Sequence, residues 1–279
     1  MKWIKKLLYN KYYIFTFVVV ILFCCFLHFI FIKKIKYNDH YIFREVTYIG
    51  HGTYGVDNLD YTNSVQGLEL GYKNGIRVME VDFLFTSDGR LVLNHYWENG
   101  IWEDSNEFLN KKIKGSYTAM DILDLLKYME KYDDLYIVMD TKENEYNNGK
   151  SVYDVYREIV NKTREYNEKL LDKFIIQLYS YDDLKEVNKI YEFKNKMFTM
   201  YKLGERFNIY NLVYYCLRND VSSIVIPYTY FMYNLIDEDD VRFIRSKNID
   251  VYVNTINDYN VYNNLLDMGV SGVYTDFLN

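Results

Sequence analysis

From residue 46 to the C-terminus, short apolar runs with β-strand character alternate with amphipathic helical patterns. Leaving out one hairpin arm, eight such strands are separated by helices, beginning at residues 46–50 and ending near Val273. This alternation implies parallel strands joined by right-handed crossovers, and eight units suggest closure into a barrel. The pattern therefore predicts an α/β fold, a TIM-type (β/α)8 barrel, over residues 46–279.

The N-terminal part has a different character. Residues 13–32 are almost wholly apolar, and roughly twenty such residues span a bilayer as an α-helix. Bulky side chains continue up to Lys33, without the small-residue cleavage site of a secretory signal. We therefore predict a basic segment (1–12), a transmembrane anchor (13–32) and a linker (33–45). Lysines flank the span on both sides, so the positive-inside rule discriminates little, and we expect an extracytoplasmic domain, as for a signal anchor.

Composition narrows the range of functions. The net charge of −6 and the pI near 5.4 give no sign of a nucleic-acid partner. Cys24 and Cys25 lie in the apolar run, which leaves Cys216 as the single cysteine of the barrel region. A disulfide framework or a Cys-rich zinc site is therefore excluded there. We interpret Cys216 as a core residue, because it lies within a predicted helix.

Residues able to do chemistry gather where strands are predicted to end. Glu80 and Asp82 are two apart on one strand, so their side chains point to the same face. Inside a barrel, two carboxylates repel each other and lose hydration unless a cation binds them. Asp140 offers a third carboxylate at another strand end. We therefore predict a divalent metal, Mg²⁺ or Ca²⁺, on these oxygen ligands. The alternative is a solvated strand tip without metal.

Two histidines also lie at strand ends. His51 ends the first strand, and His95 ends residues 90–95, which a tight turn at 86–89 makes an antiparallel arm. Glu80 and His95 are equally far in sequence from the centre of this turn, so we expect them to be cross-strand neighbours. Both histidines can then reach one barrel mouth and divide the roles of general acid and base. They are the candidate catalytic residues, and a structural role is the alternative.

Lys142 lies two residues after Asp140, on the same face. It is the candidate residue for binding an anionic substrate group, such as a phosphate, as a point charge. An ion pair with Asp140 or Glu80 is compatible with that role.

Together these residues resemble the glycerophosphodiester phosphodiesterase family, a barrel superfamily shared with phosphatidylinositol-specific phospholipase C. The resemblance covers most of residues 46–279, and it is the ordered set of short segments that is specific. The segments are Ile49-Gly50-His51-Gly52, Asn63-Ser64, Glu80-Val81-Asp82, Thr86-Ser87-Asp88-Gly89, Asn94-His95, Asp140-Thr141-Lys142, Thr255-Ile256-Asn257 and Gly269-Val270-Ser271-Gly272-Val273-Tyr274-Thr275-Asp276.

Several positions depart from the family pattern. The histidines and the metal carboxylates are kept, while several substrate-binding positions are not. Gly52 replaces an Arg after the first His, Thr62 a Glu, Tyr96 an Asp, Asp140 a Glu, and Asn254 a Trp.

The resemblance implies a metal-dependent phosphodiesterase that cleaves a glycerophosphodiester or a related phospholipid headgroup ester. With the predicted anchor over residues 13–32, we expect a membrane-anchored enzyme. One of His51 and His95 would deprotonate a substrate hydroxyl that attacks phosphorus, and the other would protonate the leaving alcohol. The metal and Lys142 would stabilise the charge on the phosphoryl oxygens. A lyase that releases a cyclic phosphate, a silent barrel that binds a glycerophosphate-type ligand, and a scaffold for a membrane complex are the alternatives.

Overall fold

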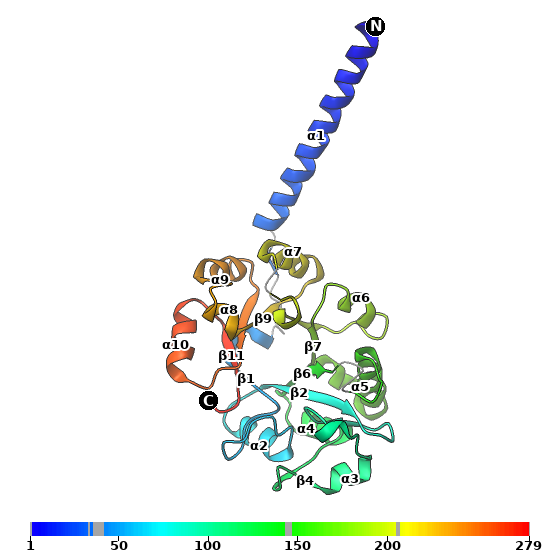
Figure 1. Ribbon diagram of the computed structural model, residues 1–279, viewed down its shortest axis with the longest axis vertical. Coiled ribbons are helices and arrows are strands. Elements are labelled where there is room, and N and C mark those ends of the chain that lie inside the picture. Colours follow the sequence, from blue (N-terminus) through cyan, green and yellow to red (C-terminus); the bar gives the residue numbers. More distant parts are fainter. Residues whose placement is uncertain (1, 33, 36–41, 143–146, 205–206, 279) are drawn as a thin grey trace.

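The structure is a computed structural model that describes residues 2–32, 34–35, 42–142, 147–204 and 207–278. Within these residues, eight parallel strands form a closed sheet (Figure 1). β1 pairs with β2 on one side and with β11 on the other, which closes the barrel and confirms the predicted fold. In order around the barrel, the strands are β1 (Tyr48–Gly50), β2 (Val78–Phe85), β6 (Tyr136–Thr141), β7 (Phe174–Leu178), β8 (Asn195–Thr199), β9 (Ser223–Pro227), β10 (Asp250–Asn254) and β11 (Gly272–Thr275).

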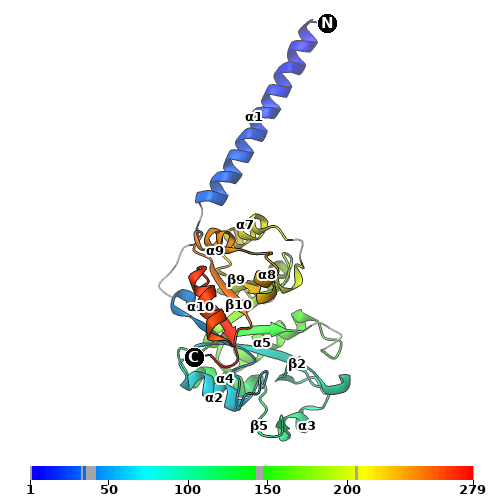
Figure 2. The same ribbon diagram turned by 60° about the vertical axis from the view of Figure 1, so that its left-hand side comes forward.

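Helices cover the outside of the barrel (Figures 1 and 2). Several begin with an Asp or Ser side chain that accepts a hydrogen bond from the first turn, as helix N-termini require. They are α2 (Val65–Lys73), α3 (Ser105–Asn110), α4 (Ile122–Lys131), α5 (Val152–Asn167), α6 (Asp183–Val187), α7 (Ile209–Asn219), α8 (Tyr228–Met232), α9 (Glu238–Arg245) and α10 (Tyr259–Asp267). Short 3₁₀ turns are η1 (Ile42–Glu45), η2 (Glu98–Gly100), η4 (Glu168–Lys173) and η5 (Met200–Lys202).

Strand alternation separates two apolar layers. Met79 and Val81 of β2 pack in the layer between the strands and the helices. Val78 belongs to a second cluster, inside the barrel, with residues such as Ile175 of the facing strands. Glu80 and Asp82 follow Val78 at two-residue steps, so they continue the interior side toward the C-terminal end of the strand.

The other end of the barrel is closed by apolar residues. Phe43 of η1 is buried, and its ring lies 5.7 Å from that of Tyr252. The backbone N–H of Ile35 donates to the carbonyl of Lys247, and the Asn248 side chain donates to the carbonyl of Ile35. Because Lys247 and Asn248 precede β10, the chain from the N-terminal helix meets the barrel at the N-terminal ends of the strands.

Helix α1 (Lys2–Ile32) extends away from the barrel in both views (Figures 1 and 2). Near its end, the rings of Phe26 and Phe29 contact Tyr214 of α7 at 5.4 and 5.2 Å. We find no helix in the described residues that combines the length and the apolarity needed to cross a membrane. The described residues of the predicted segments 1–12 and 13–32 form one continuous helix. Residue 1 and part of the predicted linker (33 and 36–41) lie outside the described residues.

The predicted register of the hairpin arm is wrong by one residue. β3 (Leu91–Leu93) is antiparallel to β2, as predicted, but Phe83 pairs with Leu93. This register places His95 opposite Val81 instead of Glu80. The backbone N–H of Thr86 donates to the carbonyl of Arg90, so the turn is centred on Asp88, and a shift of one residue exchanges the two faces of a strand. The backbone N–H of Asn94 still donates to the carbonyl of Asp82, and the imidazole of the next residue, His95, lies 4.3 Å from the ring of Tyr61.

A second, smaller hairpin lies between the hairpin arm and β6. Its strands are β4 (Lys112–Ile113) and β5 (Tyr117–Thr118). The cap of α4 is Asp121, which forms a reciprocal capping box with Asp124. Residues 96–116 also contain η2 and α3.

Candidate active site

His51 lies at the C-terminal end of β1, beside the end of β11. Its backbone N–H donates to the carbonyl of Thr275 at 3.0 Å. Its Nδ1 lies 3.0 Å from Oδ1 of Asp276, and the Thr255 hydroxyl lies 3.4 Å from the same nitrogen. Asn257 donates to the other oxygen of Asp276 at 2.7 Å. The imidazole is therefore held in one orientation by a buried carboxylate that is itself fixed.

The surroundings of His51 favour its protonated form. Burial lowers the pKa of His51, but the hydrogen bond to Asp276 and the negative charges of Glu80, Asp276 and Asp82 outweigh it. The net result raises the pKa of His51 to about 9. At neutral pH this histidine is therefore a proton donor.

Three carboxylates lie together at the mouth of the barrel. Asp82 on β2 and Asp140 on β6 are register partners, and Glu80 lies one interior step below Asp82. One oxygen from each of Glu80, Asp82 and Asp140 lies within 4.8 Å of the others. Glu80 and Asp82 are almost completely buried. Burial, and then the charge of Asp82, raises the pKa of Glu80 well above its usual range.

Lys142 joins two members of this cluster. Its ammonium lies 2.6 Å from Oδ1 of Asp82 and also pairs with Asp140. Burial lowers the pKa of Lys142, but the charges of Asp140, Asp82 and Glu80 outweigh it and raise the pKa. Burial raises the pKa of Asp82, but Lys142, His95 and the Asn63 hydrogen bond give a net lowering. Lys142 therefore offsets only part of the cluster's negative charge.

This donor set suits a divalent cation. Two oxygens on opposite sides of one Ca²⁺ are separated by at most about 5 Å, and the three carboxylates meet that limit. In the described part of the chain no cationic side chain forms an ion pair with Glu80, and the charges of His51 and Lys142 lower its pKa less than burial and Asp82 raise it. A bound cation would offset this remaining charge. Glu80, Asp82 and Asp140 are therefore the residues that could hold the metal.

The segment after β1 positions the carboxylates. The backbone N–H of Gly52 donates to Oε2 of Glu80 at 2.7 Å, and that of Thr53 donates to the Glu80 carbonyl. Asn63 donates to Oδ2 of Asp82 at 2.8 Å and accepts from the Asp82 backbone N–H at 3.1 Å. Residues 52–63 thus bind the two neighbouring carboxylates of β2 directly.

His95 faces His51 across an aromatic side chain. The ring of Tyr61 has its centroid 4.3 Å from the imidazole of His51 and 4.3 Å from that of His95. His95 is partly buried. Burial lowers its pKa, against the opposing charge of Asp82. The two histidines are therefore at one mouth, as predicted, and their pKa values are shifted in opposite directions.

Sequence reasoning missed several residues of this mouth. Asp276 and Asn257 belong to the family-like segments at the end of the chain, so the resemblance carried a signal for them. Asn63 carried the same kind of signal. Tyr179, whose hydroxyl donates to Asp140, follows β7 with no motif around it. Tyr61 likewise gave no signal, because an isolated tyrosine in a loop of a Tyr-rich chain is uninformative.

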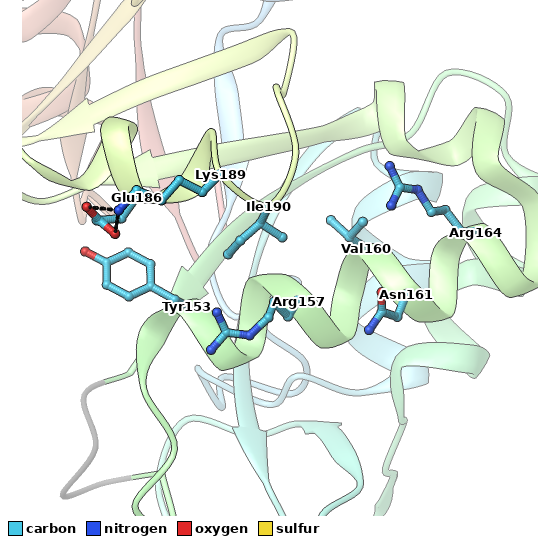
Figure 3. Close-up of a pocket in the computed structure, with 8 residues that line it drawn as sticks. All are labelled: Tyr153, Arg157, Val160, Asn161, Arg164, Glu186, Lys189 and Ile190. Carbon is cyan, nitrogen blue, oxygen red and sulfur yellow. Dashed lines mark hydrogen bonds and ion pairs between the residues drawn. The ribbon is translucent and has the colours of Figure 1, made fainter.

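A cavity of about 360 Å³ lies elsewhere, between α5 and α6 on the outside of the barrel (Figure 3). Three basic side chains line it, but each has an acidic partner: Arg157 with Asp154, Arg164 with Glu168, and Lys189 with Glu186. None of the residues at the barrel mouth lines it. We assign no function to this cavity.

Comparison with known proteins agrees with the geometry. No protein of curated function matches the sequence. Solved structures share the fold. A glycerophosphodiester phosphodiesterase from Parabacteroides distasonis has a TM-score of 0.63 and 16% identity, covering 83% of this chain and 93% of that one. One from Thermotoga maritima has a TM-score of 0.56 and 21% identity, covering 83% and 94%. An Oleispira antarctica phosphodiesterase in complex with the product sn-glycerol-3-phosphate has a TM-score of 0.58 and 16% identity, covering 82% and 92%.

The sequence also matches the model of a protein family. The model of the glycerophosphoryl diester phosphodiesterase family matches residues 103–279, which is more than half of the 279-residue chain. The matched part contains Asp140, Lys142 and Asp276 and begins after both histidines of the mouth. The chain therefore belongs to the glycerophosphoryl diester phosphodiesterase family and is a phosphoric diester hydrolase.

Proposed function

We propose that this chain hydrolyses a glycerophosphodiester, with His51 and His95 as a proton-transfer pair and a divalent cation on Glu80, Asp82 and Asp140. One observation carries the proposal. Two histidines whose pKa values are shifted in opposite directions lie at the same barrel mouth as three carboxylates, whose negative charge Lys142 offsets only in part. The bound sn-glycerol-3-phosphate of the Oleispira antarctica relative supports a glycerophosphate product.

The opposite pKa shifts suggest which histidine does what. His95, with its pKa lowered, is the better general base, because it is unprotonated at neutral pH. His51, with its pKa raised by Asp276, is the better general acid. In this assignment His95 accepts the proton of the glycerol hydroxyl next to the phosphate, and that oxygen attacks phosphorus. His51 donates its proton to the oxygen of the leaving alcohol.

The second half of the reaction reverses these roles. Water attacks the cyclic phosphate intermediate, His51 now takes the proton of the water, and His95 returns a proton to the glycerol oxygen. Lys142 contributes a fixed positive charge near the phosphoryl oxygens, since Asp82 and Asp140 hold its ammonium in place. A bound Mg²⁺ or Ca²⁺ would stabilise the developing negative charge on those oxygens.

The position of α1 bears on the substrate. Residues 34–35 and 42–45 contact the barrel at the N-terminal ends of the strands, whereas the candidate site lies at the opposite end. A site that opens away from α1 favours a released, water-soluble glycerophosphodiester over an intact lipid held in a bilayer beside that helix.

The membrane anchor over residues 13–32, with an extracytoplasmic domain, is also part of this proposal. Large apolar side chains are exposed on every side of α1, among them Ile14, Phe15 and Phe17. An α-helix that is apolar around its whole circumference is usually covered by other protein or by lipid. Attachment of α1 to a membrane would provide that cover.

The activity is tested by incubating the domain with glycerophosphocholine and, separately, with a lysophospholipid, following the products by phosphorus NMR. We expect glycerol 3-phosphate from the soluble diester, with turnover that chelator abolishes and Mg²⁺ or Ca²⁺ restores. Changing either histidine to alanine should lower kcat by roughly 10²- to 10⁴-fold, because each moves a proton in the transition state. Accumulation of a cyclic phosphate alone would indicate a lyase, and absent turnover would contradict the proposal.

The assignment of acid and base is tested by the pH dependence of kcat/KM. The acidic limb should follow His95, which must lose its proton, and lie below the usual pKa of histidine. The alkaline limb should follow His51, which must keep its proton, and lie at or below about 9, because a bound cation offsets part of the charge that raises this pKa. Asp276→Asn removes one negative charge from His51, so the alkaline limb should move to lower pH. An unchanged alkaline limb would assign the acid role elsewhere.

Attachment is tested by fractionating cells that express the full chain or a chain without residues 2–32. The full chain should sediment with membranes, and the shortened chain should not. Protease added to intact cells should digest the domain if it is extracytoplasmic. A full chain found in the soluble fraction would refute the anchor, and a domain protected until lysis would reverse its orientation.

A further inference from the structure

Tyr61 lies next to both histidines. Its ring centroid is 4.3 Å from that of His51 and 4.3 Å from that of His95. An acid and a base that act on one phosphodiester must both come within hydrogen-bond reach of it. A phosphoryl group bound between the two imidazoles would therefore lie close to Tyr61.

The hydroxyl of Tyr61 lies within electrostatic reach of the carboxylates of the site. Burial raises the pKa of Tyr61, and so do the negative charges of Asp276, Glu80 and Asp82, all of which belong to the barrel mouth. A phenol in these surroundings keeps its proton at any pH at which the protein functions. Tyr61 therefore carries a neutral hydrogen-bond donor beside both candidate catalytic histidines.

The position of Tyr61 is linked to Gly52. A Cβ atom on residue 52 would lie 2.7 Å from Cα of Tyr61, and Gly52 has a φ of 52°. Tyr61 itself has a φ of 47°, and Thr53 and Asn63 in the same segment also have positive φ. Such conformations persist where surrounding contacts hold them, often at functional sites. An arginine side chain at position 52 would clash with the backbone of Tyr61 on this path.

We propose that Tyr61 is a substrate-binding residue whose hydroxyl donates a hydrogen bond to a non-bridging oxygen of the phosphodiester. This hydrogen bond takes the role of the arginine that the family pattern has at position 52, where this chain has Gly52. This inference rests on the proposed function. A phosphodiester carries one negative charge, whereas a phosphate monoester product carries close to two at neutral pH. A neutral donor has a weaker preference than a cation for the more highly charged product, so it retains the product less strongly relative to the substrate.

The test uses the full chain with Tyr61→Phe, which removes only the hydroxyl, and Tyr96→Phe as the matched control. Tyr96 is exposed, and its ring contacts His95 alone of the two histidines, at 5.7 Å. With glycerophosphocholine and saturating Mg²⁺ or Ca²⁺, Tyr61→Phe should lower kcat/KM by about 10-fold or more, as expected for a lost hydrogen bond to a charged group. Most of the loss should appear in KM, because the hydrogen bond is present before and during reaction. Tyr96→Phe should stay within about 2-fold of wild type.

Equal kcat/KM in Tyr61→Phe and Tyr96→Phe would overturn the inference, and so would a Tyr61→Ala protein faster than wild type, since the ring would then only obstruct the site. If wild type cleaves no diester, the proposed function is wrong, but the role of Tyr61 in binding can still be tested. Calorimetric titration with sn-glycerol 3-phosphate then measures the affinity of each variant. Weaker binding by Tyr61→Phe than by wild type and Tyr96→Phe supports the inference. Equal binding, or no binding by wild type, overturns it.

Discussion

Three carboxylates buried at one end of a barrel are the constraint around which this molecule is arranged. Glu80, Asp82 and Asp140 lie within reach of a single cation. Burial raises the pKa values of Glu80 and Asp140, whereas Lys142 contributes to a lowered pKa of Asp82. Lys142 offsets part of that charge, and Asn63 and the backbone of Gly52 satisfy individual oxygens. Buried like charges persist only when they are compensated. The rest of the barrel provides the framework that holds them together.

The same charges determine how the histidines behave. Glu80 and Asp82 contribute to the raised pKa of His51, together with Asp276. His95 has no carboxylate bonded to it among the described contacts, and burial lowers its pKa. The bond to Asp276 and the charges of the cluster thus make His51 a proton donor, while burial makes His95 a proton acceptor. A cation bound to the carboxylates would reduce this difference, which links metal binding to acid–base chemistry in the proposed reaction.

Much of the barrel could be predicted from the sequence, because each strand is an apolar run that ends in polar residues. Glu80, Asp82, Asp140 and Lys142 meet as expected from alternation along two neighbouring strands. The hairpin register could not be predicted reliably, because one residue in the turn decides it.

Long-range contacts were harder to predict. His51 and Asp276 lie 225 residues apart in the chain and meet only because β1 and β11 close the barrel. Tyr61 reaches both histidines through a run of positive φ angles that no pattern of apolar residues encodes. These contacts depend on closure of the sheet and on the path of one loop, and neither is a local property of the sequence.

The central claim is that the carboxylate cluster binds a divalent cation, and calorimetric titration of the folded domain tests it most directly. Mg²⁺ and Ca²⁺ should be titrated into wild type, into Glu80→Gln, and into Glu98→Gln, whose exposed side chain serves as the matched control. The account predicts one cation per domain in wild type and in Glu98→Gln, and binding weakened by about 10-fold or more in Glu80→Gln, since a charged ligand is lost. Equal binding by Glu80→Gln, or no binding of either cation by wild type, would contradict it.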